Sequence, residues 1–358
     1  MNTIGYGVGR CVCAGLLWSL AACSSINPYF DPVLAHRGRD GFRNNYPTGG
    51  ENSYWRWQWE RWRDGHPRPP ANDYRFPMAD PEVAFLRANN GAPTVTWIGH
   101  ATVLLQVGGQ NILTDPHLSA RASPLSFAGP PRRVPPGLTY EQLPHIDAVV
   151  ISHNHYDHLD AESITRLAAQ AGGPPQFYVP LGLQRWFNAL GITTVTELDW
   201  WESRELAGVK IHCVPVQHWS QRTLADRNQA LWGGWVILHP TLRFFFTGDT
   251  GYSQDFKDIE RRFGSFDLAA IPIGAYAPRW FMAPSHVDPA EAVQIHLDLR
   301  ARHSLGIHWG TFEMTDEPLD EPPVLLQQEL AKRGIAPDRF FVLQHGETRR
   351  LGAPLASR

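Results

Sequence analysis

The sequence has little of three things: cysteine, excess charge and long apolar segments. Its 358 residues include four cysteines, and the formal net charge is -3 with a sequence pI near 6.6. A near-neutral chain gives no global electrostatic reason to bind a polyanion, so nucleic acid is not an expected partner. A chain of this length buries a sizeable core, which predicts a soluble globular protein of one large or two smaller domains.

One apolar run, CVCAGLLWSLAA at residues 11–22, stands out near the N-terminus. It is too short to cross a bilayer as a mature helix. It follows Arg10 and ends in LAAC at Cys23, a pattern that resembles a bacterial lipoprotein signal peptide and its cleavage site. The resemblance implies removal of residues 1–22 and lipid attachment to Cys23. The alternatives are an N-terminal membrane anchor and a secretory signal that is cleaved elsewhere.

This interpretation predicts both the location and the redox state of the protein. Ser24 and Ser25 follow the lipidated cysteine and provide no aspartate retention signal, so we expect a lipid-anchored protein of the cell envelope, at the outer membrane and facing the periplasm. Cys11 and Cys13 would leave with the signal, so no intrachain disulfide is expected. Cys213 lies in the valine-rich segment VKIHCVPVQ, which predicts a buried, unreactive thiol on a strand.

Residues 23–92 are rich in Pro, Gly, Asn and Arg, which predicts an irregular lead-in that wraps the main domain at residues 93–358. Within the lead-in, the segment YWRWQWERW places Trp55, Trp59 and Trp62 at i, i+4 and i+7, so they form one face of a helix. Packing of this face against the domain is the simpler explanation. Contact with a bilayer or lipid is the alternative.

From Thr94 onward, short β-rich runs such as TVTWIG, ATVLLQV, AVVIS and RFFFTGD dominate, and helical segments alternate with the later ones. This pattern predicts an α/β fold of β-sheets packed face to face and covered by helices. The expected helices are 161–171, 181–190, 254–263, 289–301 and 323–333. The fourth opens with Asp288-Pro289-Ala290-Glu291, which is typical of a capping box.

Potential metal ligands follow several of the apolar runs. The segment VVISHNHYDHLD places four of them, His153, His155, Asp157 and His158, directly after a strand-like run. Three more end comparable runs: His218 after CVPVQ, Asp249 after RFFFTG and His308 after SLGI. Taken singly, each of these three is more typical of a structural residue at a strand end. Together, the five histidines and two aspartates are a ligand set that suits zinc and related divalent ions.

The order H-x-H-x-D-H, then His, then Asp in Gly-Asp-Thr, then His resembles the metallo-β-lactamase superfamily. The resemblance implies an αββα sandwich, with two packed mixed sheets flanked by helices, and two divalent ions, most simply Zn²⁺. It implies one ion held by His153, His155 and His218, and another held by Asp157, His158 and His308. It also implies that Asp249 bridges the two ions. Asp115 in LTDP matches an upstream aspartate that would orient a ligand histidine.

Longer segments, among them TWIGHATV, ISHNHYDHLD, QHWSQRTLADRN, LWGGW, HVDPAEAV and IHWGTF, resemble the N-acylphosphatidylethanolamine-hydrolysing phospholipase D family over roughly residues 94–350. The resemblance implies a zinc-dependent phosphodiesterase that releases N-acylethanolamine and phosphatidic acid from a membrane phospholipid. The chain departs from the family pattern at Ala277 and Ser285, where that pattern has a glutamate and a glutamine.

Two alternative functions stay open on the sequence alone: another metal-dependent hydrolase of the superfamily, such as a lactonase or esterase, and a non-catalytic lipid-binding envelope lipoprotein. A homodimer is a possible assembly. The expected catalytic residues are Asp157, Asp249 and His286, the last with either a catalytic or a substrate-orienting role. The remaining histidines of interest are interpreted as structural: His100, His117, His296 and His303.

Overall fold

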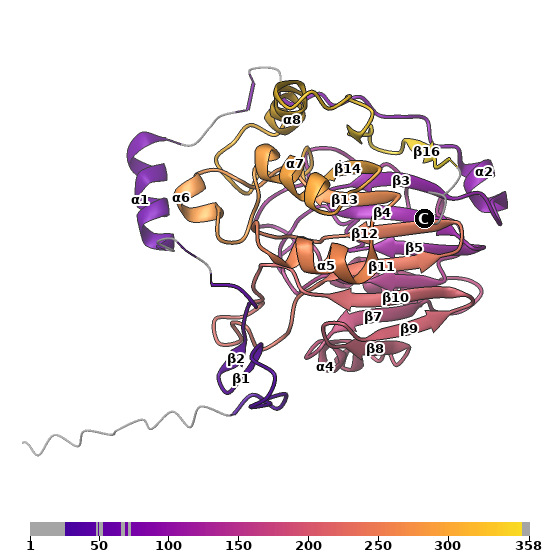
Figure 1. The fold of residues 1–358 in the computed structure, drawn as a ribbon, viewed down its shortest axis with the longest axis horizontal. Helices are drawn as coiled ribbons and strands as arrows, with labels where there is room; N and C mark the ends of the chain where they lie inside the picture. The colour runs from indigo at the N-terminus through magenta and orange to yellow at the C-terminus, as the bar shows by residue number, and fades with distance from the viewer. Residues whose placement is uncertain (1–25, 48, 50–52, 66–68, 71–72, 353–358) are drawn as a thin grey trace, which may run out of the picture.

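Two seven-stranded mixed β-sheets lie face to face at the centre of the molecule (Figure 1). The structure is a computed structural model that describes residues 26–47, 49, 53–65, 69–70 and 73–352. The expected signal peptide and Cys23 therefore lie outside the described residues. The first sheet has the spatial order β16 (Thr348–Arg350), β3 (Thr94–Gly99), β4 (Thr102–Val107), β5 (Gln110–Thr114), β6 (Ala148–Val150), β7 (Gln176–Pro180) and β8 (Val195–Leu198). The second has the order β15 (Phe340–Phe341), β14 (His303–Ile307), β13 (Leu268–Pro272), β12 (Leu242–Phe246), β11 (Gly234–His239), β10 (Val209–Val214) and β9 (Ser203–Leu206).

Each sheet joins an antiparallel half to a parallel half. Strands β5 to β8 are parallel in the first sheet, and β12 to β15 are parallel in the second. Strand β10 runs in the same direction as β12, because both pair antiparallel with β11. The carboxyl ends of strands that run in one direction lie at the same edge of a sheet. The segments that follow β5 and β6 therefore lie at one edge of the first sheet, and those that follow β10, β12 and β14 lie at one edge of the second.

The core fills both the space between the sheets and the space beneath the helices. In β4, Val103 and Leu105 belong to the cluster between the sheets, whereas Leu104 packs in a second cluster on the outer face. Successive side chains of a strand point to opposite faces of the sheet, and all those of β4 are buried because both faces are covered. The outer cluster lies under α2 (Val83–Ala88), α3 (Ala161–Ala168) and α4 (Gln184–Ala189), and the second sheet is covered by α5 (Asp255–Phe263), α7 (Pro289–Asp298) and α8 (Glu321–Lys332). The predicted αββα sandwich is confirmed.

All five predicted helices are present, although their ends differ from the predictions. The helix predicted at 289–301 ends at Asp298, and Arg300 has a φ of 48°, in the left-handed region that cannot continue a helix. Its start agrees with the prediction: Asp288 accepts a hydrogen bond from the Glu291 backbone, and Glu291 returns one. Cys213 is a buried free thiol on β10, as predicted.

The N-terminal segment adds a small hairpin, β1 (Arg37–Gly38) and β2 (Gly41–Phe42), and helix α1 (Tyr54–Asp64), which lies beside α6 (Arg279–Met282) at the left of Figure 1. Trp57 is the buried tryptophan of α1. Trp55, Trp59 and Trp62 are 80%, 57% and 74% exposed, so the expectation that their face packs against the domain is wrong. Trp57 lies on the opposite side of the helix, and that side meets the domain.

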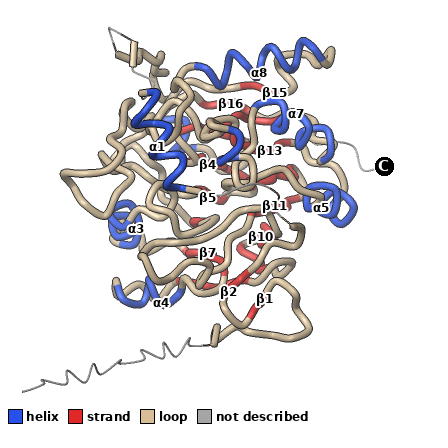
Figure 2. The backbone as a smooth tube through the Cα atoms, turned by 90° about the vertical axis from the view of Figure 1, so that its left-hand side faces the viewer, coloured by secondary structure: helices blue, strands red, loops and turns tan. Residues whose placement is uncertain are grey.

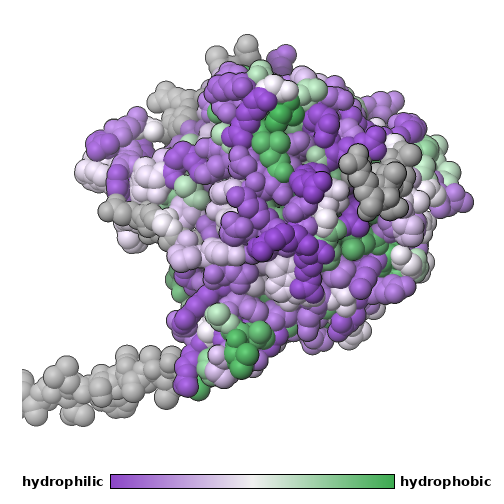
Figure 3. All heavy atoms as spheres, in the orientation of Figure 1, coloured by the Kyte–Doolittle hydropathy of each residue, from purple (hydrophilic) through white to green (hydrophobic). Residues whose placement is uncertain are grey.

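Most of the surface in Figure 3 is hydrophilic, with small separate apolar patches. Among the described residues, we find no helix with the length and apolar character needed to cross a membrane.

Candidate metal centre

The loop after β6 carries four of the predicted ligands. The backbone N–H groups of His158 and Leu159 both donate to the carbonyl of His155, so the chain turns sharply after it leaves the strand. This turn places His153 and His155 on one side and Asp157 and His158 on the other. All four side chains are largely withdrawn from solvent, His155 least completely.

Three imidazole nitrogens converge in the first group. His155 Nδ1 lies 2.8 Å from His153 Nε2 and 3.3 Å from His218 Nε2. The ligand atoms of these three residues all lie within 4.8 Å of one another. Nitrogens bound to one zinc ion at about 2.0–2.1 Å need this kind of proximity. His218, which is far along the sequence, comes from the end of the β10 segment.

The second group combines a carboxylate with imidazoles. Asp157 Oδ2 lies 3.2 Å from His158 Nε2 and 3.3 Å from His308 Nε2. His100 also joins this group, because its Nε2 lies 3.0 Å from the same oxygen. The interpretation of His100 as a merely structural residue is therefore incomplete: its partner is one of the predicted ligands. The sequence signal for it was only its position in the turn after TWIG.

Asp249 lies between the two groups. Its Oδ2 is 3.1 Å from His158 Nε2, 3.9 Å from His218 Nε2 and 4.0 Å from His153 Nε2. Its Oδ1 is 3.1 Å from His308 Nε2. One carboxylate thus reaches nitrogens of both groups, which is the position a bridging ligand needs.

Gly248 allows Asp249 to approach this closely. Its φ is +62°, and a Cβ built on it would lie 2.4 Å from the Ser152 Cβ. A larger residue would push the β12 loop away from the β6 loop.

The outer hydrogen bonds fix the orientation of three ligand rings. His158 Nδ1 donates to Asp115 Oδ2 at 2.7 Å, and His218 Nδ1 donates to the Ser285 carbonyl at 3.0 Å. His153 Nδ1 lies 2.9 Å from Ser152 Oγ, whose hydroxyl donates in turn to Asp115. Each ring therefore presents its Nε2 lone pair to the centre, which is the tautomer that binds a metal. Asp115 occupies the orienting position predicted for it.

Several buried atoms at the centre have no hydrogen-bond partner within the protein. They are His158 Nε2, Asp249 Oδ1 and His286 Nδ1. Unpaired buried polar atoms are costly, and in a native structure they commonly mark a ligand site. The nitrogen and carboxylate donors fit divalent metal ions of the zinc type.

The backbone at the site is also unusual. His100, Asp115 and His308 have φ values of 53°, 33° and 59°, in the left-handed region that side-chain-bearing residues seldom adopt. Such conformations persist only where the surrounding structure imposes them, and they cluster at functional sites.

Burial and the neighbouring carboxylates shift the pKa values of the histidines at the centre in opposite directions. Burial lowers the pKa of His155 to about 4, which keeps its imidazole neutral and able to bind a metal. Burial also lowers the pKa of His308, but Asp249 and Asp157 outweigh it and raise that pKa to about 9. Among protein groups alone, a proton on His308 therefore balances the carboxylates. A bound cation would replace that proton.

The other predicted residues fall in two classes. His286 faces the centre, with Nδ1 3.8 Å from Asp249 Oδ2, and burial lowers its pKa to about 4. His296, by contrast, is buried away from the centre, with Nδ1 2.8 Å from Ser304 Oγ. His117 is buried beside Arg132, and His303 is half-buried at the start of β14.

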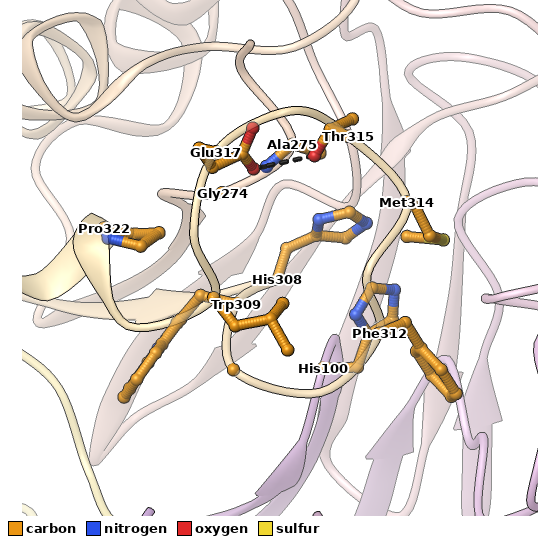
Figure 4. A pocket seen from close by; sticks show the side chains of 12 residues that line it. His100, Gly274, Ala275, His308, Trp309, Phe312, Met314, Thr315, Glu317 and Pro322 are labelled. Carbon is orange, nitrogen blue, oxygen red and sulfur yellow. Dashed lines mark hydrogen bonds between the residues drawn. The ribbon is translucent and has the colours of Figure 1, made fainter. Parts of the chain in front are cut away.

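A narrow pocket opens beside the second group (Figure 4). His100, His308, Phe312 and Met314 line it together with Glu317. Glu317 accepts hydrogen bonds from the backbone N–H groups of Ala275 and Ala277. Glu317 therefore places a carboxylate beside Ala277, the position at which the family pattern has a glutamate. Ser285 is the other position that differs from the family pattern. Its backbone carbonyl accepts a hydrogen bond from His218 Nδ1, and this hydrogen bond does not depend on the side chain at position 285.

A wider pocket adjoins the ligand loop. Its lining includes Arg121, Leu125, Tyr156 and Arg222. The Arg222 guanidinium lies over the Tyr156 ring at 4.1 Å and donates to the Asn154 carbonyl at 2.9 Å. It thus places a partly buried positive charge beside the two residues that flank His155.

The fold and the grouped histidines and aspartates define the class of metal-dependent hydrolases. A family model described as "Beta-lactamase superfamily domain" matches residues 110–309. The chain belongs to this superfamily, and within it to the family that includes the N-acylphosphatidylethanolamine-hydrolysing phospholipases D.

Two relatives support this assignment, and a solved structure shares the fold. The chain is 47% identical over 258 residues to N-acyl-phosphatidylethanolamine-hydrolyzing phospholipase D 1 of Caenorhabditis elegans, covering 69% of this chain and 72% of the relative. It is 37% identical over 264 residues to the mitochondrial enzyme of that name from Saccharomyces cerevisiae, covering 71% and 55%. The isothiocyanate hydrolase from Delia radicum gut bacteria has a similar fold, with a TM-score of 0.57 and 21% identity over 72% of this chain and 98% of its own.

Proposed function

We propose that the protein is a zinc-dependent phosphodiesterase of the phospholipase D type. In this proposal it hydrolyses N-acylphosphatidylethanolamine or related phospholipids to an N-acylethanolamine and phosphatidic acid. The observation that carries the proposal is the Asp249 carboxylate, which reaches nitrogens of both ligand groups. The names of the two phospholipase relatives favour the phosphodiester as the substrate class.

The two groups would each hold one ion. His153, His155 and His218 would hold the first, and Asp157, His158 and His308 the second, with Asp249 between them. When bound, two such ions supply an activated water and neutralise charge on phosphate oxygens. The protein contributes a rigid frame, because Asp115, Ser152 and the Ser285 carbonyl hold the rings in place.

Two further residues would act on the substrate itself. His286 is neutral, because burial lowers its pKa to about 4, and its Nδ1 faces the centre without a partner. It can orient a phosphoryl oxygen or hold a proton near the leaving oxygen. Arg222 would attract the phosphate from the pocket beside the loop, since no carboxylate pairs with its guanidinium among the described ion pairs.

The proposed location brings the enzyme to its substrate. Lipidation of Cys23 would hold the chain at the outer membrane, facing the periplasm. Membrane phospholipid is then the partner that the centre meets. More than one acyl chain is needed for stable anchoring, and the modification of a lipoprotein cysteine supplies them.

The test is a comparison of substrates with metal-loaded protein. N-acylphosphatidylethanolamine, plain phosphatidylethanolamine, a soluble phosphodiester and a lactone are assayed side by side. In water enriched in oxygen-18, attack at phosphorus forms a new P–O bond and breaks the P–O bond to the alcohol. The label should therefore appear in phosphatidic acid and not in the N-acylethanolamine. A clear preference for the lactone, or no cleavage of any phosphodiester, would overturn the proposal.

A further inference from the structure

Helix α1 presents a row of exposed tryptophans to solvent. Trp55, Trp59 and Trp62 are 80%, 57% and 74% exposed, and they lie on one side because of their i, i+4, i+7 spacing. The rings of Trp59 and Trp62 are 4.9 Å apart. Three large aromatic side chains left uncovered on an 11-residue helix form a surface that favours a partner.

The opposite side of α1 fastens it firmly to the domain. The Trp57 indole N–H donates to Asp316 Oδ2 at 2.7 Å, and its ring stacks on Phe281 with centroids 4.9 Å apart. Trp280 donates from its indole to Glu60 at 3.0 Å. The helix is therefore held in one orientation on α6, and its tryptophan row points outward.

The charges on α1 are balanced. Arg56 pairs with Glu60 at 2.9 Å, and Arg63 pairs with Asp64 at 2.6 Å. Arg61 pairs with Asp316 at 2.9 Å. With every cation of the helix matched by a carboxylate, the surface has no excess charge that would select a polyanion or an acidic peptide. A neutral tryptophan-rich face instead matches the zwitterionic interface of a bilayer, where tryptophan is enriched.

The position of α1 links this surface to the metal centre. Helix α6 leads into the segment that ends at His286, and the Arg279 guanidinium donates to the His286 carbonyl at 2.8 Å. In Figure 2, which looks onto this side of the molecule, α1 lies in front of the sheets. A flat surface that meets α1 would therefore also meet the side on which His286 approaches the centre.

We propose that α1 is an interfacial docking helix for a phospholipid bilayer. Its three exposed tryptophans enter the boundary between headgroups and acyl chains, and the helix lies in the plane of the membrane. This contact is additional to the anchor proposed at Cys23, and it does not depend on which bond the enzyme cleaves.

The experiment uses the full chain with Cys23→Ser, so that no acyl group contributes to binding. Flotation with phosphatidylcholine vesicles should show binding that changes little with salt. In the same background, the triple variant Trp55→Ser, Trp59→Ser, Trp62→Ser should lower the partition coefficient by at least about tenfold, because the buried aromatic area is lost.

A matched control removes exposed apolar side chains elsewhere. Val324 on α8 and Leu297 on α7 are 55% and 43% exposed, and both helices lie away from α1 in Figure 1. The variant Leu297→Ser, Val324→Ser should bind vesicles as the parent does. Circular dichroism and metal content should be unchanged in both variants, because none of the substituted side chains is buried.

Three results would overturn the proposal: equal vesicle binding by the parent and the triple variant, no binding by the parent, or an equal loss in the control variant. Molecular mass in solution provides a further check. A dimeric parent and a monomeric triple variant would show that the row contacts a second copy of the chain instead. Failure of vesicle binding with intact phosphodiesterase activity would leave the proposed function in place.

Discussion

Replacement of Asp115 by Asn tests how the protein orients its metal ligands. All three groups that face the Asp115 carboxylate are donors: the Ser152 backbone N–H at 2.7 Å, the Ser152 hydroxyl, and His158 Nδ1 at 2.7 Å. An asparagine has one oxygen, so its NH₂ group must face at least one of these donors. A buried clash of this kind costs about 1–3 kcal/mol. The substitution should add no backbone strain, because Asn tolerates the φ of 33° at this position.

The expected result is a loss of metal affinity. Outer hydrogen bonds to metal ligands contribute about 10–100-fold in affinity, which corresponds to about 1.4–2.8 kcal/mol and agrees with the cost of the clash. The measurement is competition with a chromophoric chelator, together with denaturant unfolding of the metal-free protein, which should also be destabilised.

Asp147→Asn is the matched control. Asp147 lies at the opposite end of β6 and accepts a hydrogen bond from the Asn111 backbone at 2.8 Å, far along the strand from the ligands. It should leave metal affinity unchanged. The reasoning is refuted if Asp115→Asn binds metal as tightly as the parent does, or no more weakly than Asp147→Asn.

Three other predictions follow from particular residues. Asp249→Ala should lower metal content, and it should lower the rate of hydrolysis by at least about a hundredfold, because a methyl group cannot bridge two ions. Metal content is measured by elemental analysis after dialysis. A variant with full metal content and full activity would contradict this prediction. His296→Gln should weaken the dependence of stability on pH. Burial lowers the pKa of His296 to about 4 in the folded protein, whereas an unfolded histidine has a pKa of about 6.5. The neutral side chain therefore contributes its full stability above about pH 6.5. Up to about 3 kcal/mol of the free energy of unfolding is lost as the pH falls toward about 4. Denaturant midpoints at pH 7 and pH 4.5 should therefore differ less in the variant than in the parent. Cys23→Ser should either release the protein from the membrane fraction or block removal of residues 1–22. Mass spectrometry that finds an unmodified N-terminus elsewhere in the wild-type protein would contradict the lipid anchor.

The candidate metal centre shows how much of a site a sequence can reveal when its polar residues lie at strand ends. His153, His218, Asp249 and His308 each follow an apolar run. Strands of one sheet that run in one direction end at one edge, so the residues that follow β10, β12 and β14 gather there without knowledge of the loops between them. The packing of the two sheets then brings the loop after β6 to the same place. The capping box at Asp288 and the buried Cys213 were predictable for a similar reason, because both depend on local sequence.

The tertiary structure alone decided which neighbours these residues have. The sequence places His100 in a turn, but only the packing of that turn against the β6 loop brings its ring to 3.0 Å from Asp157. Likewise, Glu317 supplies a carboxylate beside Ala277 from forty residues away. Helical spacing predicted that Trp55, Trp59 and Trp62 share a face, yet it could not say whether that face or the one with Trp57 meets the domain. Periodicity defines the faces of a helix, whereas the surface opposite decides which face is buried, and that surface is assembled from residues distant in the chain.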